Sequence, residues 1–383
     1  MGTEITLAVG GMDVDCSKNH RGNDHGSLFQ ERDQTQVRTG QTDYAHDGDF
    51  DDDELAAMEA ALVRKLSDVV PRLELLGYTL ATAKAEYSLA LERWAEETFD
   101  GTPRKKPLTF SKFMAFATRT PVAELSGRYD SNLDDEEMKG RFAGLKEIDR
   151  VPHVDLWDRD HYSEMSYFAN VIGFFHPYSI LRILAENPAN LDLDVTWQYG
   201  PLVDNGYAEA KEFVADSRRR ERFLVATEGS SDVHILRHGF ELLRPGVSDF
   251  FHFADVSEGH PFSGTGQLRK FAEGLAKIDV QNQTIFVFDN DAEGVEAARK
   301  VEAMKLPRNM RAMVLPDRNE LKRPRRRNRD LSRSQSWRTS ASSGYVEQLQ
   351  EGSRALAWRA RLQRELCPVF YGPVCDDAPF VRL

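Results

Sequence analysis

The stretch IFVFDNDAEG, residues 285–294, decides the fold of the C-terminal part of the chain. Four apolar residues in a row lead to Asp289 and Asp291, and a polar helical pattern begins directly after them. A short apolar run of this kind is typical of a buried strand in a parallel sheet. Because side chains alternate along a strand, both aspartates lie on the same side if the strand extends that far. The stretch therefore predicts a buried strand with two carboxylates at its carboxyl end.

The same alternation of strands and helices runs from residue 221 to about residue 316. Apolar strands separated by helices of roughly ten residues indicate a parallel α/β sheet. Ligands of open α/β sheets bind beyond the carboxyl ends of the strands. The predicted strands are RFLVATE, SDFFHFADV, QTIFVFDND and RAMVLP, and the predicted helices are SSDVHILRHGFELL, GQLRKFAEGLAKI and AEGVEAARKVEAM.

Two of these strands end in acidic residues. The first leads to Glu228, followed by Gly229, which allows a sharp turn, and by Asp232; the other leads to Asp289 and Asp291. Carboxylates held together repel one another, and a hard divalent cation relieves that repulsion. Mg²⁺ (or Mn²⁺) prefers oxygen ligands and recruits phosphate oxygens, so the pattern predicts a metal site for phosphate-ester chemistry. Two interpretations of Asp232 stay open, a supporting acid of this cluster and a first-turn acid that stabilises its helix.

FLVATEGSSDVHIL followed by IFVFDNDAEG resembles a Toprim domain, the catalytic module of topoisomerases, bacterial primases, overcoming-lysogenization-defect nucleases and a 5S-RNA maturation nuclease. The family pattern is a strand ending in Glu-Gly and a later strand ending in Asp-x-Asp, which Glu228, Asp289 and Asp291 match. The resemblance covers about a quarter of the chain. It implies a Rossmann-like parallel sheet, Mg²⁺ on the two aspartates, and Glu228 as general acid or base or as a further metal ligand.

A second resemblance lies at the N-terminus. ITLAVGGMDVDCSKN, with NDHGSLFQ soon after it, is similar to the start of bacterial proteins that join one shared domain to either a Toprim or a HEPN module. The chain has no Arg-x(4–6)-His, the motif of HEPN ribonucleases, so the resemblance implies the version that carries Toprim. It further implies a role in defence against phage and other mobile elements.

Residues 1–220 are predicted to form a largely helical α+β domain. EITLAV alternates and favours a strand or two followed by loops. Residues 51–99 favour helices, because Leu62 and Leu66 continue a helical spacing, and Pro71 is expected to kink this run or to start a second helix. The other predicted elements are buried helices in LTFSKFMAFAT and SYFANVIGFF, a strand and turn in LDLDVTWQYGPL, and a polar helix in EAKEFVADSRRRER.

The most apolar window, residues 167–185, is interrupted by His176, Pro177 and Arg182. This favours a buried helix pair over a membrane span. Three cysteines are too few and too scattered for a disulfide framework, so a reducing compartment and a cytoplasmic location are expected. The N-terminus has no basic segment of the signal-peptide kind.

The charge is unevenly distributed along the chain. The net charge of −12 argues mildly against a general nucleic-acid binder, yet Lys322 to Arg338 holds eight basic residues and one acidic residue. This run is either a disordered arm that touches phosphates or part of a diverged ending. After VLPDRNEL the α/β pattern stops, so residues 221–320 are taken as the Toprim-like domain and residues 321–383 as an irregular or disordered tail. We hypothesise that the ending from about residue 318 is diverged or frame-shifted. Comparison with the gene's other reading frames tests this hypothesis.

Other candidates carry alternatives. FSGTGQLRK, residues 262–270, has glycines before a helix and either cradles a phosphate with Arg269 or Lys270 nearby or is an ordinary loop. Asp255 and Glu258 follow another strand and either border the site or are solvated loop acids. No zinc site is expected near the N-terminus, because no fourth ligand is evident beside Cys16, His20 and His25.

The pair Asp289 and Asp291 has two competing interpretations. It resembles the Asp-x-Asp of haloacid-dehalogenase-like phosphatases, but that family places Thr or Val directly after the second Asp, where this chain has Ala292. The two acids could also simply cap the helix that follows them.

The predicted function is Mg²⁺-dependent cleavage of phosphodiester bonds in DNA or RNA. The N-terminal domain would recognise a protein partner or trigger, no membrane is involved, and a homo-oligomer is compatible with the sequence. Two alternatives remain, namely nucleotidyl transfer of the primase kind and a non-catalytic sensor or binding module that only holds a metal.

Overall fold

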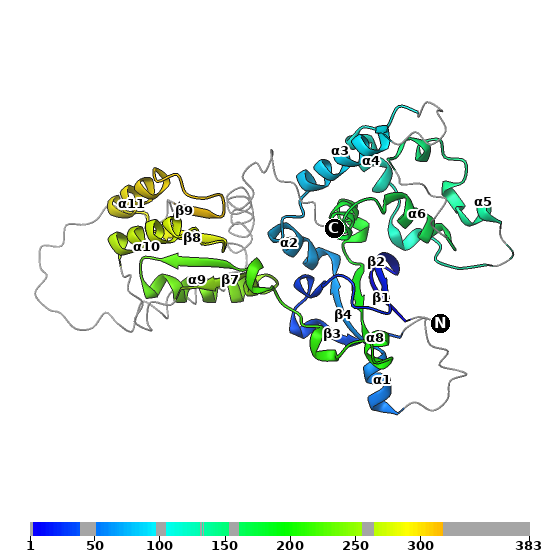
Figure 1. Cartoon of the computed structure of the whole chain (residues 1–383), viewed down its shortest axis with the longest axis horizontal. Helices are drawn as coiled ribbons and strands as arrows, with labels where there is room; N and C mark the ends of the chain where they lie inside the picture. The colour runs from blue at the N-terminus through cyan, green and yellow to red at the C-terminus, as the bar shows by residue number, and fades with distance from the viewer. Residues whose placement is uncertain are drawn as a thin grey trace, which may run out of the picture. The chain divides into compact units, whose positions relative to one another are not determined.

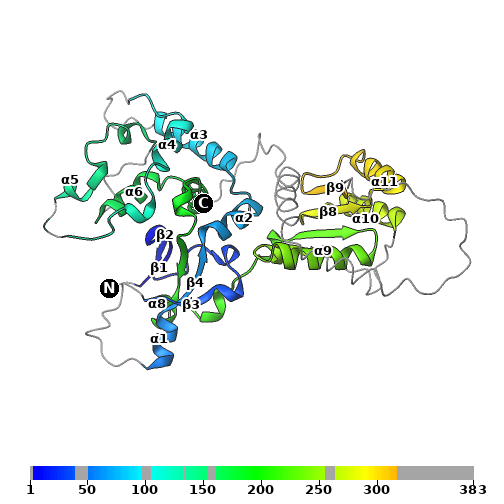
Figure 2. The ribbon, with the colours of Figure 1, turned by 180° about the vertical axis from the view of Figure 1, so that it is seen from behind.

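The computed structural model describes residues 3–38, 51–96, 105–130, 132, 134–152, 161–254 and 264–316. It divides the chain into two compact units, Met1–Glu221 and Arg222–Leu383, whose elements are labelled in Figure 1 and seen from behind in Figure 2. The expected boundary was between residues 220 and 221, and the structure divides after Glu221. The predicted basic arm and tail lie outside the described residues, as do Asp255 and Glu258.

The first unit is built on a five-stranded sheet in which every described pairing is antiparallel. Its order is β2-β1-β5-β4-β3, so strands from the start of the chain lie beside a strand that ends near residue 198. Trp197 of β5 is wholly enclosed in the core of this unit. The strands are β1 (Glu4–Val9), β2 (Met12–Lys18), β3 (Gln34–Gln36), β4 (Ala60–Lys65) and β5 (Asp194–Gln198).

Helices complete the core of the first unit. The buried helix pair expected between residues 167 and 185 is confirmed as α6 and α7, which bury Phe168, Val171, Ile180 and Leu181. No described helix has the length and apolar character that crossing a membrane requires. The helices are α1 (Asp52–Met58), α2 (Leu66–Leu75), α3 (Leu80–Glu96), α4 (Phe110–Ala117), α5 (Asp135–Met138), α6 (Glu164–Ile172), α7 (Pro177–Leu184) and α8 (Gly200–Asp204).

The helical prediction for residues 51–99 is wrong at residues 60–65, which form β4. The chain leaves the helical conformation after Met58, and β4 pairs with β5 so that Leu62 lies opposite Trp197. Residues 60–65 form a strand although their apolar spacing suits a helix, because they pair with β5, which is distant in the sequence. Of the two expectations for Pro71, the start of a helix is wrong, because Pro71 lies inside α2, which begins at Leu66; the kink stays a prediction.

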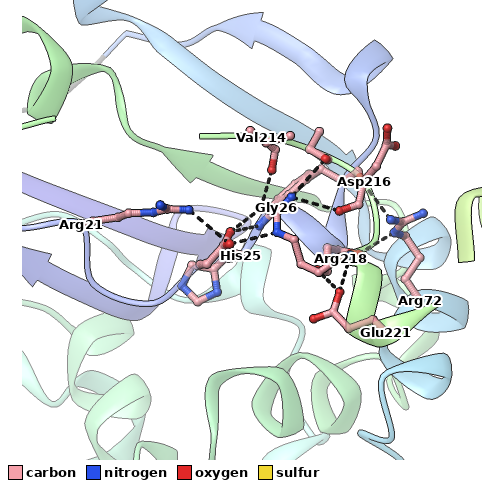
Figure 3. Close-up of polar contacts among 12 residues, drawn as sticks. Arg21, His25, Gly26, Arg72, Val214, Asp216, Arg218 and Glu221 are labelled. Carbon is pink, nitrogen blue, oxygen red and sulfur yellow. Dashed lines mark hydrogen bonds and ion pairs between the residues drawn. The ribbon is translucent and has the colours of Figure 1, made fainter. Parts of the chain in front are cut away.

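The polar helix predicted in EAKEFVADSRRRER is also wrong. The segment has two short 3-10 turns, Ala210–Glu212 and Arg219–Glu221, joined by irregular chain. The guanidinium of Arg218 donates hydrogen bonds to the carbonyls of Val214, Ala215 and Asp216, and Asp216 has a φ of +73°. Carbonyls that would accept main-chain bonds in a helix are therefore bound by a side chain (Figure 3).

The second unit is a four-stranded parallel sheet in the order β7-β6-β8-β9. The four predicted strands and three predicted helices are present, but β8 ends at Phe288, so the predicted extension of this strand through Asp289 and Asp291 is wrong. Every residue of β8 is buried, as its continuous apolar run suggests. The elements are β6 (Phe223–Thr227), α9 (Ser230–Leu243), β7 (Phe251–Phe253), α10 (Thr265–Lys277), β8 (Thr284–Phe288), α11 (Ala292–Glu302) and β9 (Met310–Val314).

The direction of strand addition reverses in the middle of this sheet. From β6 the chain goes to β7 on one side, then returns to β8 and β9 on the other. Because crossovers between parallel strands are right-handed, α9 covers one face while α10 and α11 cover the opposite face. Phe286 and Phe288 pack with residues of α10 and α11 in one core cluster. Ligands of such sheets bind where the strand order reverses, which in this sheet is at the carboxyl ends of β6 and β8.

Candidate active site

The reversal of strand order brings Glu228 and Asp289 together. Thr227, the last residue of β6, pairs with Val287 of β8, so the chain leaves both strands at the same level. The main-chain N–H of Asp289 donates a hydrogen bond of 3.0 Å to Oε1 of Glu228. Two of the predicted site residues, 61 positions apart in the sequence, are thus in direct contact.

Glu228 is held from a second direction by the start of α10. The hydroxyl of Thr265 donates to Oε2 of Glu228 at 2.7 Å, and the N–H of Gly264 donates to the main-chain carbonyl of Glu228 at 2.7 Å. Both carboxylate oxygens therefore accept a hydrogen bond from the protein. Thr265 lies in the predicted segment 262–270, but the sequence assigned it no role, because its partner lies 37 positions earlier.

Gly294 leaves the space that this arrangement needs. A Cβ on Gly294 would overlap the carbonyl oxygen of Asp289 and lie 3.0 Å from Oε1 of Glu228. Gly229 is less constrained, since its backbone is in the ordinary extended region and a Cβ there would make normal contact with Asp232. The predicted sharp turn at Gly229 therefore does not depend on glycine.

Asp291 is the N-cap residue of α11. Its Oδ1 accepts a hydrogen bond of 2.8 Å from the N–H of Gly294, so the helix-capping interpretation describes a contact that the structure contains. An ionised carboxylate has about four lone-pair sites, and one capping bond leaves the others available. Capping and metal binding by Asp291 are therefore compatible.

Two acids at this end of the sheet, Asp232 and Asp289, have raised pKa values. Burial raises the pKa of Asp232, and the charge of Glu228 adds to this effect. Burial also raises the pKa of Asp289, with further contributions from the charges of Asp232 and Asp291. Asp232 is thus both a first-turn residue of α9 and a neighbour of the other acids.

The acidic donors fit Mg²⁺ better than a softer metal. Within the described residues, no group of three or more His, Cys, Asp or Glu side chains is arranged as a ligand set. Mg²⁺ needs no such cage, because it usually binds through one or two carboxylates and keeps several waters. The mutual repulsion around Asp289 supplies the electrostatic reason for a cation there. Asp289 and Asp291 are the residues that would hold it.

Of residues 262–270, for which a phosphate cradle and an ordinary loop are the alternatives, Gly264 to Lys270 are described and form the beginning of α10, while residues 262 and 263 lie outside the described residues. Gly264 is the N-cap residue of α10, with a φ of +80°, which favours glycine. Arg269 lies one turn into the helix with its guanidinium 4.0 Å from the carboxylate of Glu273, and Lys270 is exposed. Phosphate contacts by Arg269 and Lys270 stay predictions.

Near the N-terminus, His25 is part of a buried polar network. Its Nε2 lies 2.9 Å from Oδ2 of Asp15, and its Nδ1 lies 3.3 Å from the hydroxyl of Tyr178. Cys16 is exposed on β2, and His20 accepts a hydrogen bond from the N–H of Gly22. The contacts of His25 have a structural explanation in the packing of this unit.

A second polar network fixes the end of the first unit (Figure 3). Arg218 donates to both carboxylate oxygens of Asp24, at 3.0 and 2.6 Å, and Glu221 accepts hydrogen bonds from the hydroxyl of Ser27 and the N–H of Arg218. A Cβ on Gly26 would overlap the carbonyl oxygen of Val214, so glycine is required there. Asp24, Gly26 and Ser27 lie within NDHGSLFQ, a stretch that carries a family resemblance in the sequence. None of their contacts with Val214, Arg218 or Glu221 is predicted from the sequence.

Comparison with protein families gives a match over the first unit. The family model described as HEPN/Toprim N-terminal domain 1 matches residues 1–221, more than half of the chain and the same range as the first structural unit. Neither the curated proteins nor the solved structures gave a match. The second unit, with Glu228 and Asp289, lies beyond the matched range. From the match across its first unit, the chain belongs to the HEPN/Toprim N-terminal domain 1 family.

Proposed function

We propose that the second unit is a Mg²⁺-dependent nuclease of the Toprim kind that cleaves phosphodiester bonds in DNA or RNA. The observation that carries this proposal is the contact between Glu228 and Asp289 at the point where the strand order of a parallel sheet reverses. Parallel sheets place ligand sites there. The family of the first unit, whose name joins HEPN and Toprim, supports the same conclusion.

Each acid has a distinct task in this proposal. Asp289 and Asp291 would hold Mg²⁺, which when bound supplies charge neutralisation for the phosphate. Glu228 would take the proton of the attacking water, because its carboxylate is fixed beside Asp289 by two hydrogen bonds. Asp232 would add to the negative potential that favours a cation at this end of the sheet.

The reaction is a hydrolysis that conserves atoms and charge. The water oxygen forms a bond to phosphorus while the bond between phosphorus and the leaving sugar oxygen breaks. Glu228 accepts a proton from the attacking water and later releases it to solvent, and the leaving oxygen takes a proton from a solvent water. One strand end then carries a phosphate and the other a hydroxyl.

The first unit would recognise a partner or trigger, and the whole chain would act in bacterial defence. Both parts of this proposal come from the family of residues 1–221 and from the resemblance of the N-terminal segment to defence proteins. A nuclease assay tests the second unit and does not depend on the proposed partner or on the proposed role in defence.

The test is incubation of the purified full chain with supercoiled plasmid, linear duplex, single-stranded DNA and RNA, each with Mg²⁺, Mn²⁺ or EDTA. We expect cleavage of at least one substrate with a divalent cation and none with EDTA. Glu228→Gln and Asp289→Asn should each lower the rate by about 100-fold or more, since both remove groups that act in the reaction. Glu302→Gln, an exposed acid at the end of α11, is the matched control and should cleave normally.

Three results would contradict the nuclease proposal. Full cleavage by Glu228→Gln and Asp289→Asn would remove this site from the reaction. Incorporation of labelled nucleotides without strand cutting would favour transfer of the primase kind. Metal binding without turnover of any of these nucleic acids would indicate a non-catalytic module.

A further inference from the structure

We infer that Thr265 is a positioning residue that fixes the carboxylate of Glu228 for its role in cleavage, an inference that rests on the proposed function. Thr265 is the first residue of α10, and its hydroxyl donates to Oε2 of Glu228 at 2.7 Å. Only 9% of Thr265 is exposed to solvent, so little water competes for this bond.

The hydroxyl of Thr265 is not used by the helix in which it lies. The N-cap residue of α10 is Gly264, and no side chain caps this helix. A threonine at the N-cap accepts a hydrogen bond from a main-chain N–H of its own helix, as Thr109 does from Lys112 in α4, whereas Thr265 lies one position after the N-cap of α10. Here the hydroxyl donates instead to an acid at the end of a different strand.

Two donors on opposite oxygens define the orientation of the carboxylate. The N–H of Asp289 binds Oε1 and the hydroxyl of Thr265 binds Oε2, so rotation of the Glu228 side chain would break one bond or both. The two donors belong to separate elements: Asp289 directly follows β8, and Thr265 is the first residue of α10. A general base acts efficiently only if it is held in a productive geometry. Thr265 therefore contributes to the rate through Glu228.

The matched substitutions are Thr265→Val and Thr265→Ser. Valine has nearly the shape of threonine but no hydroxyl, whereas serine keeps the hydroxyl. Thr284→Val is the control, because Thr284 is also buried in this unit and its hydroxyl binds a main-chain carbonyl, that of Asn282, at the opposite end of β8.

Two measurements on the full chain test the inference. Under steady-state conditions with saturating Mg²⁺, Thr265→Val should lower kcat on the order of 10- to 100-fold while KM for the nucleic acid changes less than about twofold. Thr265→Ser should recover most of kcat, and Thr284→Val should match the wild type. The second measurement is the amide proton resonance of Asp289 in protein selectively labelled with ¹⁵N-aspartate, recorded in EDTA. This proton lies in the hydrogen bond to Glu228, so its resonance should move in Thr265→Val and return in Thr265→Ser.

The resonance separates this inference from the nuclease proposal. If the wild type cleaves nothing but the Asp289 resonance moves in Thr265→Val and returns in Thr265→Ser, Thr265 positions Glu228 and the proposed function is wrong. If the Asp289 resonance is the same in wild type and Thr265→Val, the positioning inference is wrong whether or not the protein cleaves. An equal loss of kcat in Thr265→Val and Thr284→Val would likewise overturn it, since that loss would reflect a general effect on the unit.

Discussion

Oε1 of Glu228 accepts the main-chain N–H of Asp289, so one acid of the candidate site fixes the backbone that carries another. The contact joins the ends of β6 and β8, which are neighbours in the sheet although α9, β7 and α10 separate them in the sequence. A change of the Glu228 side chain is therefore expected to shift the backbone that carries Asp289.

The first prediction concerns the charge of Asp289. The pKa of Asp289 is raised in the folded state, so the protonated carboxyl favours folding. This contribution to stability is complete below about pH 4, the ordinary pKa of an unfolded Asp. It is lost as the pH rises through the folded pKa. At neutral pH the ionised group therefore opposes folding. Asp289→Asn should unfold at a temperature higher by roughly 2 °C or more in EDTA at about pH 7. Thermal unfolding monitored by circular dichroism measures this difference, and an unchanged or lower midpoint would contradict it.

The second prediction is that Mg²⁺ stabilises the wild-type protein. A ligand that binds only the folded state raises its stability, by about 2.7 kcal/mol at a concentration 100 times the dissociation constant. The midpoint of thermal unfolding should therefore rise with Mg²⁺ concentration. In Asp289→Asn and Asp291→Asn this rise should be much smaller, because each loses a carboxylate of the proposed site. Equal shifts in all three proteins would show that the metal binds elsewhere.

Gly294 provides the third prediction. Gly294→Ala should destabilise the second unit by about 2 kcal/mol or more, since the added Cβ overlaps the carbonyl oxygen of Asp289. Gly274→Ala is the control: a Cβ added at Gly274 would meet no neighbouring atom within 4 Å, and alanine in the interior of α10 should stabilise the protein by roughly 0.5–1 kcal/mol. Urea unfolding compares the two variants. Similar free energies of unfolding for both would mean that the close approach at Gly294 is absent in solution.

The fourth prediction concerns Arg218 and pH in the first unit. Burial alone would raise the pKa of Asp24, but hydrogen bonds from Arg218 and from the N–H of Gly26 outweigh it and hold this pKa below its ordinary value. The stability from this lowered pKa is present above about pH 4, the unfolded value, and is lost as the pH falls through the folded pKa. Arg218→Ala should cost about 2 kcal/mol at neutral pH, because it also frees three carbonyls. The difference between wild type and variant should shrink below about pH 4. A difference that is constant with pH would exclude the pair with Asp24 as its source.

The elements of the second unit could be predicted because its strands are short apolar runs, and β6 and β8 lead almost directly into helical patterns. The order of the strands could not, yet that order is what places Glu228 beside Asp289. The acids themselves were found because Glu-Gly and Asp-x-Asp are local signals. Thr265 gives no local signal, since its role depends on a partner 37 residues away.

The first unit was harder to predict for a related reason. Leu62 and Leu66 fit a helix by spacing, but β4 pairs with β5, whose residues lie more than 100 positions later in the chain. The irregular segment around Arg218 was predicted as a polar helix because its charged residues suit an exposed helix face. The contact of Arg218 with Asp24, 194 residues earlier, is what replaces the helix. In both places a long-range partner overrides a local preference.

The inner position of β6 and β8 in the parallel sheet has a consequence for how the site responds to fluctuations. In the described part of this sheet, β7 and β9 form its margins, and margins open and close most easily in the native state. Glu228 and Asp289 follow strands that are paired on both sides, so fraying of either border leaves their alignment intact. Amide hydrogen exchange should accordingly be slowest along β6 and β8. The contact between Glu228 and Asp289 should persist while the edge strands β7 and β9 open locally.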